Sequence, residues 1–212
     1  TFFVFKKSNI LEKAFTRGQQ GGQNLLVTRN CNNHSADSLV DTVEPSPWVV
    51  RFASLIPQSG DILDLACGGG RHSRLALSLG YRVVAADCNI LGLEDLRKQK
   101  SLEIVEIDLE TANPFVPGGI LHGRIFTGII VTNYLHRLIL SNLIGALADD
   151  GVLIYETFSG GNERYGHPRN PDYLLRPGEL LETARKRLQV IAYENGLIQE
   201  PRMAVVQRLC AV

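Results

Sequence analysis

From residue 45 onward, the chain alternates short apolar runs with segments in which apolar residues recur at helical spacing. Polar residues hardly interrupt the runs, as expected for strands that are buried on both faces of a parallel sheet. The runs predict strands at residues 61–66, 82–86, 102–107, 125–131, 152–157, 188–193 and 203–209. The pattern therefore indicates a sheet whose strands are mostly separated by other elements.

Helical spacing fills most of the intervals between these runs, and it predicts helices at residues 47–56, 71–80, 90–100, 138–148 and 177–187. A turn-rich stretch replaces the helix at 114–119, and residues 149–151 predict a turn before the fifth strand. No helix is predicted between the last two strands, so the final strand can run antiparallel. We predict an α/β fold: a Rossmann-like, doubly wound, mostly parallel seven-stranded sheet with an antiparallel last strand and helices on both faces.

Residues 1–44 differ from the rest of the chain in composition. They are rich in Gly, Gln, Asn and Ser and contain only two short apolar pieces, at 2–5 and 24–28. Such a segment cannot bury enough apolar surface to form a core of its own. We therefore predict an irregular N-terminal arm over residues 1–44 and one folded domain over residues 45–212.

Composition narrows the classes of function. The 22 Lys and Arg balance the 22 Asp and Glu, so the chain has no basic field that would hold a nucleic acid non-specifically. The four cysteines are scattered, without the spacing of a zinc site or a disulfide framework, which predicts a cytoplasmic protein without a metal. No apolar run approaches the roughly 18 residues of a membrane-spanning helix, and the apolar start is too short for a signal peptide.

The strongest candidate for chemistry is the sequence Asp-Ile-Leu-Asp-Leu-Ala-Cys-Gly-Gly-Gly at residues 61–70. An apolar strand here leads into three glycines, and helical spacing begins directly after them. Glycine lets such a turn bend sharply and bring backbone N–H groups against a ligand. A strand–glycine–helix unit of this kind predicts a cofactor that contains a nucleoside.

The spacing of the glycines helps to identify the cofactor. The dinucleotide fingerprint G-x-G-x-x-G would need a third glycine at position 73, which is Ser73. An acid, Asp64, also stands within the strand. The second predicted strand leads to Asp87, whose carboxylate can accept both ribose hydroxyls in either cofactor family. A nicotinamide-dependent oxidoreductase therefore stays open as an alternative.

The arrangement acid-x-small-x-Gly-x-Gly, formed by Asp64, Ala66, Gly68 and Gly70, resembles motif I of the class I S-adenosylmethionine-dependent methyltransferases. Position 66 is Ala where that family more commonly has Gly. The segments at 133–137, 156–158 and 174–180 are similar to those of bacterial small-molecule methyltransferases of the tellurite-resistance type. The resemblance covers residues 45–212, and a helix-less pair of closing strands is typical of this class.

The resemblance implies S-adenosylmethionine as the cofactor and assigns it residues at four predicted strand ends. Asp108 and Leu109 would frame the adenine. The alternative for Asp108 is that it only caps the following turn. Cys67 is expected to be a buried filler rather than a reactive thiol, and His72 a surface residue. The full set of predicted cofactor-binding residues is Asp64, Ala66, Cys67, Gly68, Gly69, Gly70, Asp87, Cys88, Asp108, Leu109, Thr132 and Asn133.

Several acceptor classes are disfavoured by motifs that the chain lacks. Residues 132–135, Thr-Asn-Tyr-Leu, differ from the Asn/Asp-Pro-Pro-aromatic element of amino-methylating nucleic-acid enzymes, and the chain has no Pro-Cys pair of the cytosine-C5 type. No carboxylate follows the fourth strand, as metal-dependent catechol-type enzymes require. We therefore expect a small-molecule acceptor, with neither a nucleic acid nor a membrane as partner.

The acceptor side is predicted from two segments. Tyr134 and His136 follow the fourth strand, where the methyl group should point, and His136 is a candidate general base or a helix-start histidine bonded to backbone. Glu156 and Tyr165 belong to or flank a long polar loop at 158–176, which suits a lid. A cofactor-binding but inactive module that acts through a partner is the third hypothesis.

Overall fold

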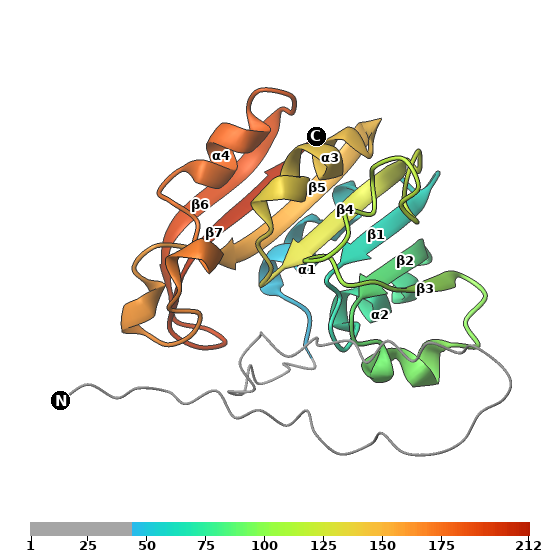
Figure 1. Cartoon of the computed structure of the whole chain (residues 1–212), viewed down its shortest axis with the longest axis horizontal. Helices are drawn as coiled ribbons and strands as arrows, with labels where there is room; N and C mark the ends of the chain where they lie inside the picture. Colours follow the sequence, from blue (N-terminus) through green and yellow to red (C-terminus); the bar gives the residue numbers. More distant parts are fainter. Residues whose placement is uncertain (1–43) are drawn as a thin grey trace, which may run out of the picture. The chain divides into compact units, whose positions relative to one another are not determined.

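The computed structural model describes residues 44–212, so the predicted arm lies, except for Glu44, outside the described residues. The domain is built on a seven-stranded sheet with the strand order β3-β2-β1-β4-β5-β7-β6 (Figure 1). Its strands are β1 (Asp61–Leu65), β2 (Arg82–Asp87), β3 (Leu102–Glu106), β4 (Phe126–Thr132), β5 (Leu147–Phe158), β6 (Val190–Ile198) and β7 (Ala204–Ala211).

Strands β1 to β5 pair in parallel, whereas β7 runs antiparallel between β5 and β6. A parallel pair needs a long crossover, but an antiparallel pair needs only a turn. The short link between β6 and β7 therefore reverses the chain direction, and β7 enters the sheet beside β5. The predicted fold class is confirmed, including the antiparallel last strand.

Alternating side chains of the central strands supply two separate cores. In β1, Leu63 and Leu65 face one core, and Ile62 faces the other. In β4, Ile129 and Val131 face the first core, and Ile130 faces the second. Because both faces of these strands are covered, nearly every residue in them is apolar. This is why the strand runs were recognisable in the sequence.

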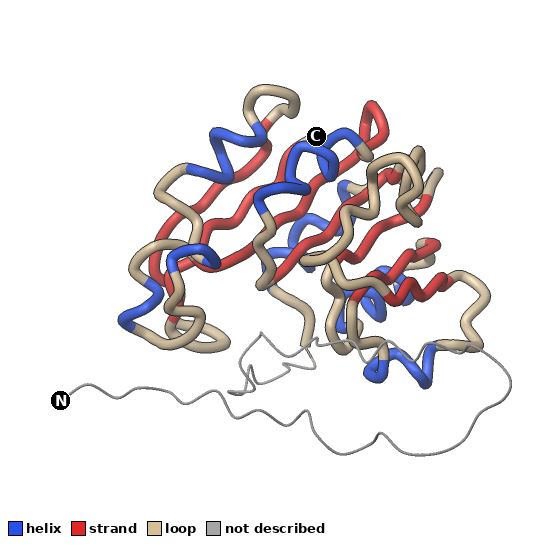
Figure 2. The backbone as a smooth tube through the Cα atoms, in the orientation of Figure 1, coloured by secondary structure: helices blue, strands red, loops and turns tan. Residues whose placement is uncertain are grey.

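Helices cover both faces of the sheet (Figures 1 and 2). On one face lie α1 (Pro47–Phe52), extended by the 3₁₀ turn η1 (Ala53–Leu55), and α2 (Arg71–Ser78). On the other lie α3 (Leu140–Gly145), preceded by η3 (Arg137–Ile139), and α4 (Glu179–Ala184). These four α-helices of the described residues are shorter than the predicted ones, since their ends are 3₁₀ turns or irregular.

The predicted helix at 90–100 is wrong, because the chain forms the 3₁₀ segment η2 (Leu91–Leu96) instead. A Cβ on Gly92 would lie 2.7 Å from the Cα of Gly69, so η2 packs directly on the glycine-rich turn. The i, i+3 spacing of a 3₁₀ turn also directs Leu93 and Leu96 into the same small core. Tertiary packing therefore overrides the local helical pattern here.

The predicted turn at 149–151 lies inside the bounds of β5, which begins at Leu147. The pairing of β4 with β5 shifts register between Phe126 and Gly128, whose partners are Leu147 and Val152. The extra residues form an irregularity at the start of β5, with Asp149 and Asp150 exposed. The polar turn signal was thus produced by a bulge rather than by the beginning of a strand.

Candidate functional site

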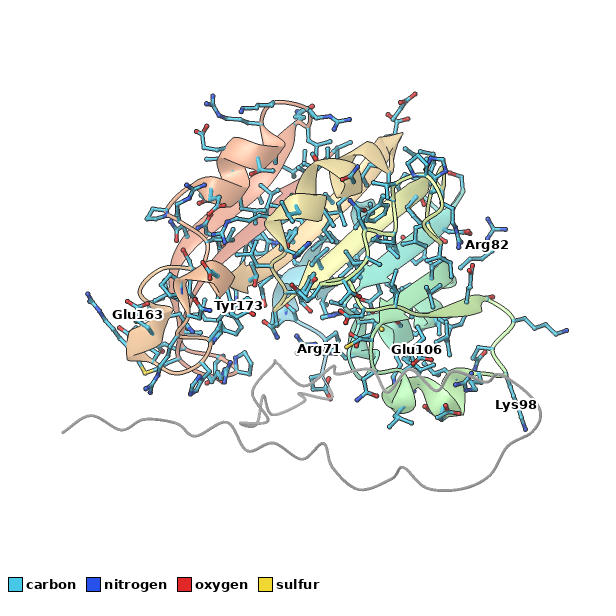
Figure 3. All side chains as sticks on the ribbon, viewed as in Figure 1. Arg71, Arg82, Lys98, Glu106, Glu163 and Tyr173 are labelled. Atoms are coloured by element: carbon cyan, nitrogen blue, oxygen red, sulfur yellow. The ribbon has the colours of Figure 1, made fainter. Side chains whose placement is uncertain are left out.

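The strand order switches between β1 and β4, because β2 and β3 lie on one side of β1 and β4 and β5 lie on the other. Ligands of open parallel sheets bind outside the carboxyl ends of the strands at such a switch point. Figure 3 shows Arg71, directly after the glycine-rich turn, on the lower side of the sheet, while Arg82 at the beginning of β2 lies on the opposite side. The predicted cofactor residues lie on this lower side of the sheet, at the carboxyl ends of β1, β2, β3 and β4.

Strained backbone marks the ends of the two central strands. Among residues 44–212, the non-glycine residues with left-handed backbone are Ala66 (φ 55°) and Asn133 (φ 56°). Ala66 follows β1 and Asn133 follows β4, and these strands are neighbours. Left-handed backbone costs an alanine roughly 1–2 kcal/mol and an asparagine less, and residues with this backbone gather at functional sites. The strain therefore points to the same edge of the sheet as the topology.

Ala66→Gly is expected to raise the free energy of unfolding by about 0.5–1 kcal/mol, because glycine adopts this φ without a Cβ clash. The matched control is Ala76→Gly within α2, where glycine should instead destabilise by about 1 kcal/mol. Urea unfolding of both variants checks the prediction. A loss of stability in Ala66→Gly would mean that the methyl group supports the turn.

The glycines of the turn have different tasks. Gly70 has a φ of 78° and caps α2, and a Cβ there would collide with the side chain of Leu93. Gly69 is the residue against which Gly92 packs. Gly68 has a φ of 53°, and a Cβ there would meet no atom within 4 Å. Gly68 therefore borders open space, while Gly69 and Gly70 allow η2 to approach.

Asp87 connects the end of β2 to the turn. Its Oδ2 accepts a hydrogen bond from the Gly68 backbone N–H at 2.8 Å, and its Oδ1 accepts one from the Asn89 N–H at 2.9 Å. A carboxylate has about four acceptor sites, so two remain for ribose hydroxyls. An acceptor next to open space at Gly68 fits the nucleoside of the predicted cofactor.

Asp64, in β1, is hydrogen-bonded to α2 across the glycine-rich turn. It is 1% exposed and accepts a 2.6 Å hydrogen bond from the Ser73 hydroxyl. Burial raises the pKa of Asp64 to about 6, although the bond from Ser73 counteracts it. Burial also raises the pKa of the Cys67 thiol, with the charges of Asp64 and Asp87 adding to the effect. Cys67 is therefore a buried thiol with a raised pKa, and its burial agrees with the expectation from the sequence.

His72 was expected to be a surface residue, and this expectation is wrong: it is 1% exposed. Its Nε2 accepts the Ser46 backbone N–H at 3.0 Å, which leaves the proton on Nδ1, 3.4 Å from the Thr132 hydroxyl oxygen. Burial lowers the pKa of His72 to about 3, with the charge of Arg71 contributing. A neutral histidine thus joins α2 to the entry of α1 and the end of β4.

His72 is expected to make the protein sensitive to acid. Its pKa of about 3 lies below the ordinary 6.5, so the unfolded chain takes up the proton first, and stability falls as the pH drops from 6.5 towards 3. Between pH 7.5 and 5.5, this linkage removes about 1 kcal/mol. Asp64, whose pKa is raised, opposes it by binding its proton in the folded state.

Urea unfolding of the wild type and His72→Gln at both pH values isolates the histidine, since Asp64 contributes equally to the two proteins. The stability advantage of the wild type should shrink by about 1 kcal/mol at pH 5.5. An equal advantage at both pH values would contradict a buried neutral histidine. Asp64→Asn serves as the control of opposite sign.

The remaining predicted cofactor residues lie at the ends of β2, β3 and β4. Asp108 Oδ1 accepts the Glu110 N–H at 3.0 Å, so Asp108 does cap its turn, and Leu109 is buried in the core. Cys88 is partly buried beside Asp87, and Asn133 is exposed. The roles of all predicted cofactor residues in binding stay predictions.

Two of the predicted acceptor-side residues are brought together by a residue that the sequence did not single out. The Tyr134 hydroxyl donates to Glu110 Oε1 at 2.9 Å, and His136 Nδ1 lies 3.3 Å from Glu110 Oε2. Burial, followed by the hydrogen bond to Glu110, raises the pKa of Tyr134. No sequence signal indicated Glu110, because it stands in a turn 24 residues before Tyr134.

The other two predicted acceptor-side residues lie apart from this cluster. Glu156 accepts the Ser46 hydroxyl at 3.0 Å and lies 2.8 Å from Arg208 Nε in a buried ion pair, although that N–H is not aligned for a hydrogen bond. Tyr165 is 43% exposed in the loop after β5. The geometry gives Glu156 a structural role, and the acceptor roles of both residues stay predictions.

Arg137 attaches the long loop after β5 to the end of β4. Its guanidinium donates to both carboxylate oxygens of Glu179 at 2.7 and 3.0 Å, and to the carbonyl oxygens of Asp172 and Leu174 at 2.6 and 2.8 Å. Burial alone would raise the pKa of Glu179, but hydrogen bonds from Arg137 and Arg176 outweigh it and lower the pKa to about 2. The base of the predicted lid is therefore firmly anchored.

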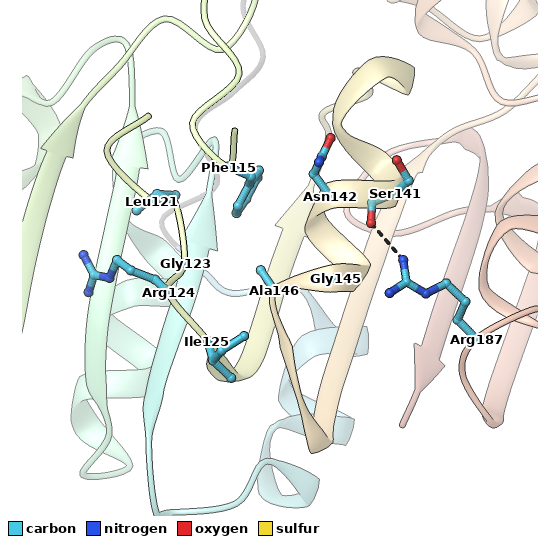
Figure 4. Close-up of a pocket in the computed structure, with 10 residues that line it drawn as sticks. All are labelled: Phe115, Leu121, Gly123, Arg124, Ile125, Ser141, Asn142, Gly145, Ala146 and Arg187. Atoms are coloured by element: carbon cyan, nitrogen blue, oxygen red, sulfur yellow. Dashed lines mark hydrogen bonds between the residues drawn. The ribbon is translucent and has the colours of Figure 1, made fainter. Parts of the chain in front are cut away.

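A cavity of about 410 Å³ lies elsewhere (Figure 4). Ile125 precedes β4 and Ala146 precedes β5, so the cavity adjoins the amino ends of these strands. Arg187 borders it and donates a 3.2 Å hydrogen bond to the Ser141 carbonyl. Because cofactors of parallel sheets bind at carboxyl ends, this cavity is not part of the candidate cofactor site.

Two further observations concern residues 44–212. No helix in this part of the chain is long and apolar enough to cross a membrane. Within the same residues, no three His, Cys, Asp or Glu side chains are grouped so that they could hold a metal ion.

No protein-family model matches the chain, and no curated protein sequence matches it. Among solved structures, TehB from Haemophilus influenzae aligns with a TM-score of 0.62 and 21% identity over 77% of this chain. The chain spans 60% of the length of that TehB protein.

Two other solved structures align over most of their own length. A methyltransferase from Methanosarcina mazei, described as S-adenosylmethionine-dependent, aligns with a TM-score of 0.59 and 16% identity over 79% of this chain and 97% of its own. The glycopeptide N-methyltransferase MtfA in complex with S-adenosylmethionine has a TM-score of 0.53 and 17% identity over 77% of this chain and 85% of its own. The described domain therefore has the class I methyltransferase fold and is structurally similar to TehB and other S-adenosylmethionine-dependent methyltransferases.

Proposed function

We propose that this chain transfers a methyl group from S-adenosylmethionine to a small-molecule acceptor by direct in-line displacement. The observation that carries the proposal is the end of β2, where the Asp87 carboxylate meets the Gly68 N–H beside open space at the reversal of strand order. Ala66 and Asn133, which have left-handed backbone, follow β1 and β4, the two strands between which the strand order reverses. A nucleoside suits this arrangement, because its ribose hydroxyls can donate hydrogen bonds to the Asp87 carboxylate while it lies against the backbone of Gly68, which has no side chain.

Each part of the edge has a distinct task in this proposal. Asp87 holds the ribose, the backbone of residues 66–70 approaches the cofactor closely, and Asp108 with Leu109 frames the adenine. Thr132 and Asn133 line the part of the site nearest the methyl group. S-adenosylmethionine supplies a methyl group that is already activated on a sulfonium, so the protein has mainly to hold the acceptor in line and exclude water.

A small molecule is the proposed acceptor because the motifs of nucleic-acid methyltransferases are missing and the charge is balanced. The glycopeptide N-methyltransferase MtfA, with which the fold is shared, supplies the same expectation by analogy. A cytoplasmic location and a domain spanning residues 45–212 belong to the proposal. The loop at 158–176 would close over the acceptor.

Calorimetric titration of the purified chain with S-adenosylmethionine, S-adenosylhomocysteine and NAD(H) tests the proposal. Binding of both sulfur compounds, and not of NAD(H), is expected. The Ser73 hydroxyl, which bonds to Asp64 where the dinucleotide fingerprint has its third glycine, argues against NAD(H). Binding of NAD(H) alone would establish the oxidoreductase alternative, and binding of none of the three would favour the inactive module.

A further inference from the structure

Glu110 joins two strand ends that are far apart in the sheet. It follows β3, whereas Tyr134 and His136 follow β4, and β2 and β1 lie between these strands. At about 4.8 Å per strand, β3 and β4 are separated by roughly 14 Å. The chain after β3 therefore runs back across the strand ends, and this path places Glu110 against the residues at the end of β4.

The two oxygens of Glu110 have different partners. Oε1 accepts the Tyr134 hydroxyl at 2.9 Å, and Oε2 lies 3.3 Å from His136 Nδ1. A carboxylate only accepts hydrogen bonds, so it favours the tautomer of His136 with the proton on Nδ1. Nε2 is then the ring nitrogen with a lone pair, on a side chain that is 17% exposed.

Among the four predicted acceptor-side residues, His136 is the one suited to accept a proton. The pKa of Tyr134 is raised by burial and by Glu110, so its hydroxyl stays protonated and acts as a donor. Glu156 is occupied by Arg208 and Ser46 on the face of the sheet that α1 covers. Tyr165 lies in the exposed part of the loop after β5.

We propose that His136 Nε2 accepts a proton from the methyl acceptor, that Glu110 is the residue positioning His136, and that the acceptor is consequently a protic nucleophile, a phenolic hydroxyl or an amine. This inference rests on the proposed methyl transfer. The inference adds a positioning residue, a proton path and a chemical class of acceptor to the proposed function.

During transfer to an acceptor X–H, the X–C bond forms while the S–C bond of the sulfonium breaks. The electron pair of the broken bond stays on sulfur, which becomes a neutral thioether. The proton of X–H passes to His136 Nε2, and Glu110 stabilises the resulting imidazolium as an ion pair. No oxidant, reductant or metal is needed.

Glu110 could instead serve only to fasten residues 107–113 to β4 through Tyr134. The two roles differ in what they require of the ring of His136. A fastening role needs any acceptor for the Tyr134 hydroxyl, which an amide oxygen also supplies. In Glu110→Gln, the oxygen can keep Tyr134, while the amide NH₂ then faces Nδ1 and favours the opposite tautomer of His136.

The first measurement is the ¹⁵N NMR signature of the His136 ring in the full chain, with no acceptor present. The wild type should show predominantly the Nδ1–H tautomer, and Glu110→Gln should shift the population towards Nε2–H. Glu103→Gln is the matched control, because it removes a β3 carboxylate that pairs with Arg124 at the other end of the strand. It should leave the His136 signals unchanged.

The second measurement is methyl transfer to phenol, catechol, tyramine and benzylamine, with dimethyl sulfide as an acceptor that loses no proton. His136→Gln should lower transfer to a protic probe by about 100-fold or more and Glu110→Gln by at least about 10-fold. S-adenosylmethionine affinity, measured by calorimetry, should change by less than about threefold in both variants.

The outcomes separate this inference from the proposed function. Cofactor binding with an unchanged His136 tautomer in Glu110→Gln would overturn the pairing alone. Methylation of dimethyl sulfide but of none of the protic probes would overturn the acceptor class. A wild type that does not bind S-adenosylmethionine would remove the proposed function, and the proton path with it.

Discussion

Replacing Asp87 with alanine is expected to weaken S-adenosylmethionine binding by about 30-fold or more. The carboxylate is the proposed acceptor for the ribose hydroxyls, and a hydrogen bond to a charged group contributes about 2 kcal/mol or more, which corresponds to that factor. Asp87 also holds the Gly68 and Asn89 N–H groups, so its loss loosens the turn that faces the cofactor. Calorimetric titration measures the change directly.

Two further variants show whether the loss belongs to the ribose contact. Asp87→Asn keeps an oxygen acceptor and should lie between the wild type and the alanine variant. Asp95→Ala is the matched control, since Asp95 is a neighbouring carboxylate that pairs with Arg74 rather than with the turn. Its affinity should stay within about twofold of the wild type. A folded Asp87→Ala protein with unchanged affinity would refute the ribose assignment.

Replacing Arg137 with methionine is expected to lower the free energy of unfolding by about 2–4 kcal/mol. The substitution leaves the largely buried Glu179 carboxylate without its bidentate partner and the carbonyl groups of Asp172 and Leu174 without a donor. Urea unfolding measures the loss. Proteolytic cleavage between residues 162 and 173 should also become faster, because the base of the loop is released.

Arg185→Met provides the control for Arg137. It lies just beyond the end of α4 and pairs with Glu182, but both side chains are more than half exposed, so its removal should cost less than about 0.5 kcal/mol. The double variant Arg137→Met with Glu179→Met should recover part of the lost stability, because it removes the largely buried carboxylate that has lost its bidentate partner. Equal stability of Arg137→Met and the wild type would show that the anchor is not energetically important.

The strands were predictable because burial on both faces leaves a continuous apolar signal within each strand. Seven runs gave seven strands, with ends that differ by a few residues. The helix predicted at 90–100 failed because its conformation depends on the glycine-rich turn, against which Gly92 packs from more than twenty positions away. A local pattern does not contain that neighbour.

In the candidate site too, the features written in a local pattern were predictable and the contacts between distant residues were not. The glycine-rich turn is a local signal, and Asp87 follows from the next strand, so the sequence identified the two groups that the structure joins at 2.8 Å. The partners of His72 and Glu156 were not predictable. Ser46 lies 26 residues from His72 and 110 residues from Glu156, and it binds both.

By itself, the sequence determined the order of strands along the chain, the glycine-rich turn and the acid that follows the second strand. Each of these features depends only on residues that are close together in the sequence. Only the tertiary structure decided that Glu110 reaches Tyr134 and His136 and that Arg137 holds Glu179. These contacts depend on the order of the strands in the sheet and on the path of the loops over their ends. Both are fixed by packing between segments far apart in the chain, which no local pattern records.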